Sequence, residues 1–259
     1  MRIRQPAVAG TFYPESADTL RSLIIDLLND APRRKLSPKV LVVPHADYEH
    51  SGAVAASAYC LLEEVRQKIR RVVLLGPPHE TSFEGVALPD CSSYSSPLGD
   101  IPLDTQTMQS LLKFHQVHQS DNFHAVEHSL EVQCPFLQVC LDDFLLIPLV
   151  VGDISAMSVA EILDYLWGGE ETLLIISTEL SHWHSYEETT YRDTLTAKTI
   201  EQLSGGLTGG QANGCDLLNG MMTVAGRRGM GVTTLDIRNS GDTTGEQDRV
   251  VGYGAFVIQ

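Results

Sequence analysis

The chain has 259 residues, of which 43% are hydrophobic and 20% charged, the balance of a globular protein large enough to bury a substantial core. Its 18 Lys and Arg residues stand against 33 Asp and Glu residues, giving a formal net charge of -15. This charge argues against nucleic acid and anionic membrane surfaces as partners, because binding to phosphate rests on Lys and Arg. No Pro-rich, Ser-rich or charged linker divides the chain, so we predict a single domain over residues 1–259.

Features of targeting segments are absent from the sequence. No apolar run approaches the roughly 20 residues of a transmembrane helix, and the first residues lack the apolar stretch of a signal peptide. The five cysteines include no C-x-x-C pair, and their odd number fits a reducing compartment. We therefore expect a cytoplasmic protein.

The first third of the chain alternates between helical and strand patterns. Apolar residues recur at helical spacing from Leu20 to Leu28, and Ser16 is the expected N-cap. A short apolar run at Val40–Val43 predicts a buried strand, and a helical stripe follows from Gly52. Val72–Leu75 predicts a second buried strand, ended by Gly76 and two prolines.

The rest of the chain continues this alternation. Glu127–Leu141 reads as a helix that Pro135 should kink or break. The alternation indicates an α/β fold with a mostly parallel central sheet flanked by helices. The other predicted elements are strands at Val86–Leu88, Leu145–Val151, Thr172–Ser177, Val232–Ile237 and Val250–Ile258, helices at Thr105–His115, Met157–Trp167, Tyr186–Leu203 and up to Ala225, and a glycine-rich loop at Ser204–Gly214.

Polar residues follow three of the predicted strands directly. His45 comes after the first buried strand, His79 after the second, and Glu179 and His182 after Thr172–Ser177. Open parallel sheets bind ligands outside the carboxyl ends of their strands. We therefore predict that these four residues share one cleft.

The residue types suggest a metal site. Two imidazoles and one carboxylate around open positions form the ligand set of non-haem iron(II) sites. His45 and His79 are the expected metal ligands, and His182 could act as a general base. Glu179 is either a ligand or a group that orients a histidine, and the residues alone leave both roles open.

A second polar concentration contains His124 and His128. A helix would place both on one face, and His-x-x-x-His can bind zinc, but the Glu of an H-E-x-x-H motif is missing. A structural or cleft-wall role is favoured over a separate metal site. The sequence also lacks a Walker A motif, a dinucleotide fingerprint and a G-x-S-x-G elbow, which disfavours nucleotide binding and serine hydrolase chemistry.

Several motifs together resemble the Memo family over nearly the whole chain. They are Pro6-Ala-Val-Ala-Gly-Thr-Phe-Tyr-Pro14, Pro44-His45-Ala46-x-Tyr48, Gly76-Pro77-Pro78-His79, Glu127-His128-Ser129-Leu130-Glu131 with Pro135, and Ser240-Gly-Asp-Thr-Thr-Gly245 followed by Arg249-Val-Val-Gly-Tyr253. The resemblance implies a fold similar to class III extradiol ring-cleavage dioxygenases. It also implies iron or copper on His45 and His79, and a catalytic role for His182 with Glu179.

The sequence departs from the family pattern at the third metal ligand. Asn213 stands where the family has a cysteine, and Cys215 lies two positions further on. An amide is a weaker ligand than a thiolate, so the metal should be held weakly or not at all. We expect Asn213, Cys215 and His128 to line the cleft.

Three functions remain open at this stage. The leading one is a Memo-family protein with a histidine-rich cleft for iron or copper and without established catalysis. The second is a non-haem metal-dependent oxygenase or hydrolase. The third is a non-catalytic module that binds a peptide or a small acid in the cleft.

Overall fold

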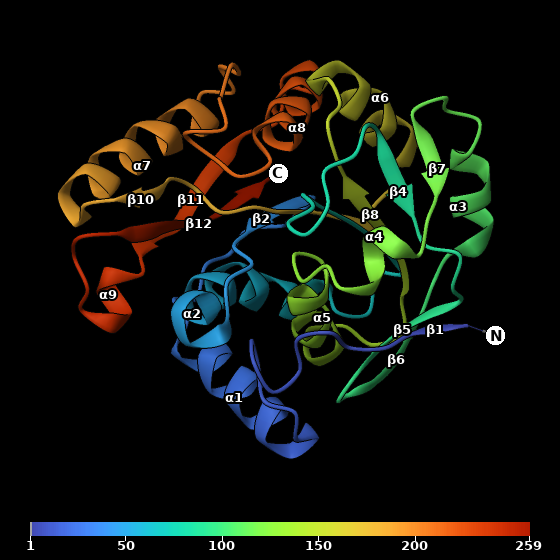
Figure 1. Ribbon diagram of the computed structural model, residues 1–259, viewed down its shortest axis with the longest axis horizontal. Coiled ribbons are helices and arrows are strands. Elements are labelled where there is room, and N and C mark those ends of the chain that lie inside the picture. Colours follow the sequence, from blue (N-terminus) through green and yellow to red (C-terminus); the bar gives the residue numbers. More distant parts are fainter. Residues whose placement is uncertain (1) are drawn as a thin grey trace.

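The computed structural model describes residues 2–259, which form an α/β fold around one large mixed sheet. Its strands run in the spatial order β10-β12-β2-β9-β3-β8-β4-β7, with β11 paired to β12, and β1, β5 and β6 form a small separate sheet (Figure 1). The strands are β1 (Ile3–Arg4), β2 (Val40–Val43), β3 (Arg71–Gly76), β4 (Val86–Leu88), β5 (Ser93–Ser96), β6 (Gly99–Pro102), β7 (Val117–Gln119), β8 (Leu145–Val151), β9 (Thr172–Ser177), β10 (His182–His184), β11 (Val232–Asn239) and β12 (Val250–Ile258).

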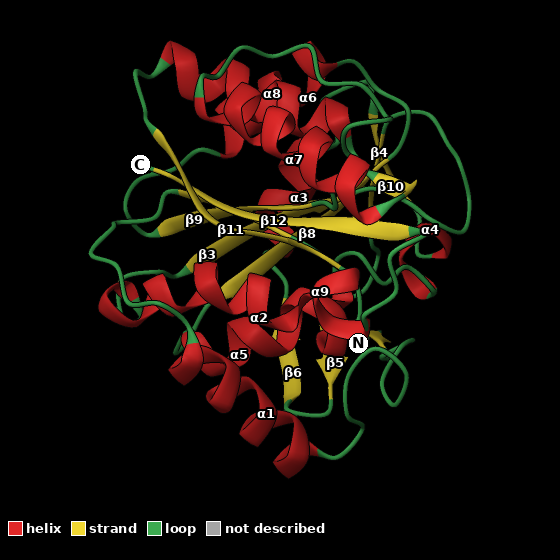
Figure 2. Cartoon of the chain, turned by 90° about the vertical axis from the view of Figure 1, so that its left-hand side faces the viewer, coloured by secondary structure: helices red, strands yellow, loops and turns green. Residues whose placement is uncertain are grey.

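Helices cover both faces of the sheet. Figure 2 shows α1, α2 and α5 on one side of it and α6, α7 and α8 on the other. The α-helices are α1 (Ala17–Asp30), α2 (Tyr48–Tyr59), α3 (Thr105–Leu111), α4 (Asn122–Ala125), α5 (Cys134–Cys140), α6 (Ala156–Leu166), α7 (Tyr186–Glu201), α8 (Cys215–Arg227) and α9 (Gly241–Thr244), and two 3-10 helices span Cys60–Val65 and Glu131–Gln133. Within residues 2–259, no helix has the length and apolar character needed to cross a membrane.

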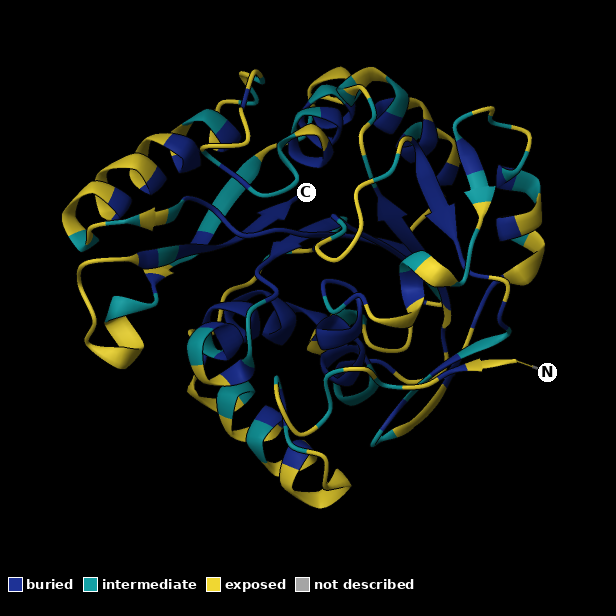
Figure 3. Ribbon diagram, viewed as in Figure 1, coloured by how far each residue is buried: buried dark blue, intermediate teal, exposed yellow. Residues whose placement is uncertain are grey.

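The four central strands, β2, β9, β3 and β8, are parallel and buried on both faces (Figure 3). Their continuous apolar runs explain this, because both sheet faces are covered by helices. β9 lies between β2 and β3, so the carboxyl ends of the three strands adjoin one another. The predicted α/β architecture is confirmed.

Antiparallel pairs flank the parallel strands on both sides, so the sheet as a whole is mixed, and the edge strand β7 pairs parallel with β4. β12 pairs antiparallel with β2, β10 and β11, and β4 pairs antiparallel with β8. The strand β10 contains a bulge at Trp183, where two residues oppose one step of β12. This edge of the sheet carries His182 to the region where β2, β9 and β3 end.

The helix predicted at Glu127–Leu141 is wrong in its first half. Residues 126–130 form a turn, a 3-10 segment follows, and α5 begins only at Cys134. Pro135 lies in the first turn of α5, where its missing N–H leaves no hydrogen bond unmade. The predicted break is thus real, but it falls at the start of the helix. The cap at Ser16 is confirmed, with its hydroxyl accepting from the Thr19 N–H.

Candidate metal centre

His45 follows β2 and is almost fully buried, with 1% of its surface exposed. Its Nδ1 lies 3.2 Å from the hydroxyl oxygen of Ser177, the last residue of β9. That hydroxyl donates to the Ser129 carbonyl at 2.6 Å and accepts from the Gln133 amide at 2.8 Å. Its single proton is therefore used, so the Ser177 oxygen must accept from the His45 Nδ1–H.

This hydrogen bond leaves a free lone pair on the other ring nitrogen of His45. Nε2 is buried and has no hydrogen-bond partner within residues 2–259. Burial lowers the pKa of His45 to about 3, so the ring is neutral at pH 7. A buried polar atom without a partner is rare in a folded protein and points to a missing ligand.

His79 follows β3 and is oriented by Glu127. The carboxylate lies 2.9 Å from His79 Nδ1 and also accepts the backbone N–H groups of His79 and Ser129. Burial alone would raise the pKa of Glu127, but the His79 ring and the backbone N–H groups outweigh it and lower the pKa to about 2. The ionised carboxylate accepts from Nδ1–H, so the lone pair of His79 lies on Nε2.

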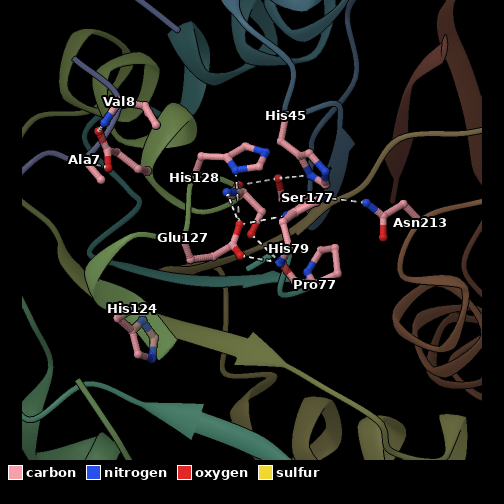
Figure 4. A network of polar contacts seen from close by, with 12 residues as sticks. Ala7, Val8, His45, Pro77, His79, His124, Glu127, His128, Ser177 and Asn213 are labelled. Carbon is pink, nitrogen blue, oxygen red and sulfur yellow. Dashed lines mark hydrogen bonds and ion pairs between the residues drawn. The ribbon is translucent and has the colours of Figure 1, made fainter. Parts of the chain in front are cut away.

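His128 completes a group of three imidazoles. One ring nitrogen from each of His45, His79 and His128 lies within 4.8 Å of the other two (Figure 4). The His128 ring also packs against Phe12, with centroids 4.7 Å apart. Burial lowers the pKa of His128. We call these three residues the histidine cluster.

His124 lies apart from the cluster (Figure 4). Its Nδ1 contacts the Tyr94 hydroxyl at 2.5 Å and its Nε2 lies 2.9 Å from the Ala87 carbonyl. His124 and His128 do not share a helical face, because α4 ends at Ala125. His124 has the structural role that the sequence favoured.

Glu179 and His182 form a hydrogen-bonded pair beside the cluster. Glu179 Oε2 lies 2.8 Å from His182 Nε2. Burial opposes the charge on each, but His45 and His182 lower the pKa of Glu179, and Glu179 raises the pKa of His182. The hydrogen-bonded pair therefore shifts the pKa values of its two members in opposite directions.

A cleft of about 640 Å³ opens above the cluster. Its walls bring together the loops after β2, β3 and β9, the glycine-rich segment and the start of β12. The lining residues are Phe12, Ala46, Asp47, His79, His128, Glu179, His182, Trp183, Gly209, Ala212, Asn213, Gly214, Val251 and Tyr253. His79, Glu179 and His182 thus share the cleft, and His45 lies beneath it with its ring 4.9 Å from that of His79.

Asn213 lines both the cleft and an adjoining cavity, whereas Cys215 lines only the adjoining cavity. Asn213 Nδ2 lies 2.8 Å from His79 Nε2 and lines the cleft. Cys215, the first residue of α8, lines a second cavity of about 310 Å³ on the other side of Gly214. Burial raises the pKa of its thiol. Cys215 was expected in the cleft wall, but it is absent from the cleft lining and lies in the adjoining cavity, which His79 and Asn213 also line.

The donor set fits a transition-metal ion. Imidazole nitrogens suit zinc, copper, iron and nickel, and each of the first two rings has its second nitrogen fixed by a hydrogen bond, as metal-bound histidines do. The unpartnered Nε2 of His45 is the strongest sign. Glu179 is held by His182 and does not belong to the cluster of potential metal ligands within residues 2–259.

Comparison with known proteins identifies the family of the chain. The pattern of the family described as Memo-like protein matches residues 4–257. The chain belongs to the Memo family. A MEMO1 family protein of Aquifex aeolicus is 32% identical over 270 residues and covers 100% of both chains. Memo relatives from Ignicoccus hospitalis and Thermoplasma volcanium are 33% and 30% identical, each covering 98% of both chains.

The sequence did not reveal the residues that orient the cluster. Glu127, Ser177 and Gln133 fix the ring nitrogens, and His128 was expected only in the cleft wall. For Ser177, the sequence did hold a signal of this role: it is the last residue of a buried strand and directly precedes the polar residues of the site. The roles of His45, His79, Glu179 and His182 themselves stay predictions.

Proposed function

We propose that this Memo-family chain binds one divalent transition-metal ion through His45, His79 and His128. The observation that carries the proposal is the buried, unpartnered Nε2 of His45, next to two further imidazoles within 4.8 Å. Iron and copper are the proposed metals, because imidazole suits both and the family resemblance points to them. Such an ion, when bound, would polarise an oxygen or nitrogen atom of a ligand in the cleft.

We further propose a small molecule as the natural occupant of the cleft, with a peptide side chain as the alternative. A volume of about 640 Å³ lies within the range of ligand pockets. Trp183 stands at the rim, 61% exposed and at a backbone φ of 64°, which is strained for a bulky residue. The bulge thus presents an aromatic face to the cleft mouth, where a planar group could stack.

The second candidate is a metal-dependent enzyme of the dioxygenase type. The Glu179–His182 pair favours it, because a hydrogen-bonded imidazole beside a metal-binding cleft can accept or return a proton during a reaction. The metal proposal does not depend on this role. Oxygen consumption in the presence of catechols and iron, compared between the natural chain and His182→Gln, separates the two candidates.

Metal titration of purified apo-protein tests the main proposal. Calorimetry with Fe(II), Cu(II) and Zn(II), followed by elemental analysis, should give one equivalent for at least iron or copper. His45→Ala, His79→Ala and His128→Ala should each weaken binding, whereas the exposed His115→Gln serves as the matched control. Unchanged affinity in all three cluster variants would refute the proposed site.

A further inference from the structure

The histidine cluster lacks a free anionic ligand. Glu127 is occupied by the His79 ring and two backbone N–H groups, and Glu179 is paired with His182. The remaining group at the His79 ring is the neutral amide of Asn213, 2.8 Å from Nε2. Because that nitrogen carries a lone pair, the amide must donate an N–H to it, and this hydrogen bond competes directly with a metal ion.

Asn213 is followed by Gly214. The backbone nitrogen of a following residue can attack the asparagine side chain, and a following glycine hinders this attack least because it has no side chain. The backbone N–H of Gly214 has no hydrogen-bond acceptor within residues 2–259. Gly214 has a φ of 82° and lies at the end of the glycine-rich segment. The nitrogen that would attack is therefore free.

Two contacts hold the Asn213 main chain without involving either reacting group. Its N–H donates to the Glu179 carbonyl at 3.1 Å, and its carbonyl accepts from the Thr178 hydroxyl. The side chain keeps one hydrogen bond, to His79. It can rotate out of that bond toward Gly214.

We propose that Asn213 is a deamidation site, and that the resulting carboxylate completes the metal centre. The Gly214 nitrogen attacks the side-chain carbonyl carbon of Asn213, a C–N bond forms, and the amide nitrogen leaves as ammonia with the Gly214 proton. Water then opens the cyclic imide, placing a hydroxyl on the carbonyl carbon and a proton on the Gly214 nitrogen. Opening at the former side-chain carbon yields aspartate, and opening at the main-chain carbon yields isoaspartate.

The aspartate product changes the site in two ways. A carboxylate has no N–H, so it no longer occupies the lone pair of His79, and it adds a negative charge where the neutral amide stood. Together with the imidazoles of the histidine cluster, it would supply the combination of histidine and carboxylate ligands that non-haem iron sites use. This inference rests on the proposed metal function. It names Asn213 as the residue whose deamidation would complete the metal centre.

The chain contains an internal control for the chemistry. Asn219 is also followed by a glycine, but it lies within α8, and its side chain is tied to the N–H and carbonyl of Leu207 at 2.9 and 2.8 Å. Both asparagines fall in the same tryptic peptide, Thr199–Arg227. A single fragmentation spectrum therefore reports both positions.

The experiment ages the folded full-length protein at mildly alkaline pH, with urea-unfolded protein as the positive control. We expect conversion at Asn213 and retention of the amide at Asn219, with Fe(II) affinity rising about tenfold or more as conversion proceeds. Asn213→Asp should show the raised affinity at once, and Asn213→Gln should show no rise with age.

Two results would overturn the inference. One is conversion of Asn213 in the folded protein no faster than that of Asn219; the other is Fe(II) affinity for Asn213→Asp equal to that of fresh natural protein. If fresh protein binds metal through the histidine cluster in either case, the proposed function survives. If neither fresh protein nor Asn213→Asp binds metal there, the proposed function itself fails.

Discussion

A single hydroxyl group decides which nitrogen of His45 is free. The Ser177 oxygen accepts from His45 Nδ1 while its own proton goes to the Ser129 carbonyl. Such partners of metal-binding histidines affect metal affinity strongly, since they fix both the ring orientation and the protonated nitrogen. The hydroxyl of Ser177 is therefore a positioning group for the proposed metal.

Removing this hydroxyl should weaken metal binding without unfolding the protein. Ser177→Ala leaves the His45 Nδ1–H and one N–H of the Gln133 amide without their acceptor, and we expect a loss of about 10- to 100-fold in Fe(II) or Cu(II) affinity. Ser57→Ala is the matched control, because Ser57 is also buried but bonds to the Val54 carbonyl within α2. Calorimetric titration measures both, and equal affinities would contradict the role of Ser177.

Substitution of Asn213 by cysteine should strengthen metal binding. A thiolate at this position brings charge and a soft donor to the cluster, whereas the amide hydrogen-bonds to His79 Nε2. Cys215→Ser should leave affinity unchanged, because Cys215 does not belong to the potential metal ligands found within residues 2–259. If Cys215→Ser removed a metal that the natural protein held, Cys215 would be the ligand.

The buried histidines should make the metal-free protein sensitive to acid. Burial lowers the pKa of His45 to about 3, so between roughly pH 6.5 and 3 the unfolded chain binds a proton there that the folded chain does not. The free energy of unfolding therefore falls as pH falls through this window, by up to about 1.4 kcal/mol per pH unit. Asp193, whose pKa burial raises to about 6, works in the opposite direction below that pH.

Urea unfolding of His45→Gln between pH 7 and 4 isolates the His45 contribution. The free energy of unfolding should fall less steeply with acidification than in the natural chain. The exposed His115→Gln should keep the natural slope. Identical slopes for His45→Gln and the natural chain would mean that His45 is not held neutral by burial.

At the scale of the elements, Glu131 ties the N-terminal segment to the loop that carries Glu127 and His128. Its carboxylate accepts from the Arg4 guanidinium, from the backbone N–H groups of Ala7 and Val8, and from the Tyr13 hydroxyl. Arg4 in turn donates to the carbonyls of His124 and Glu127. Both partners are almost fully buried. The pair therefore holds two distant segments in register at the site.

Breaking this pair should be costly. Glu131→Gln leaves the Arg4 charge buried without a counterion, and we expect a loss of about 3–5 kcal/mol in the free energy of unfolding. The Arg33–Glu63 pair is exposed, so Glu63→Gln should cost about 1 kcal/mol or less. Chemical denaturation measures both. Equal, small losses would contradict a role for Glu131 in holding the site.

The sequence predicted those elements whose apolar pattern is long and continuous. β2, β3 and β9 were identified because each is a buried apolar run, and their carboxyl ends placed His45, His79 and Glu179 near one another. β10 was missed, because three residues containing two histidines have no strand pattern. The turn before α5 was missed as well, because the side chain of Glu127 contacts His79, which is distant in the sequence, and such a contact leaves no local periodicity.

At the scale of the whole molecule, the polar side chains of the site gather at the carboxyl ends of the central strands. The central strands are mostly apolar and end together, whereas the loops that follow them supply the histidine cluster and the Glu179–His182 pair (Figure 1). The net charge of -15 also favours the approach of a metal cation over that of an anionic polymer. Fold and charge together are consistent with a cation-binding cleft.

Anomalous diffraction from metal-loaded crystals tests the central claim most directly. With data collected on both sides of the iron or copper absorption edge, we predict one strong peak at about 2.1 Å from a ring nitrogen of each of His45, His79 and His128. For His45 that nitrogen should be Nε2, with Ser177 still at Nδ1. A peak located instead at Cys215 with Asp153 and Asp216 of the adjoining cavity, or no ordered peak in loaded crystals, would contradict the proposed metal centre.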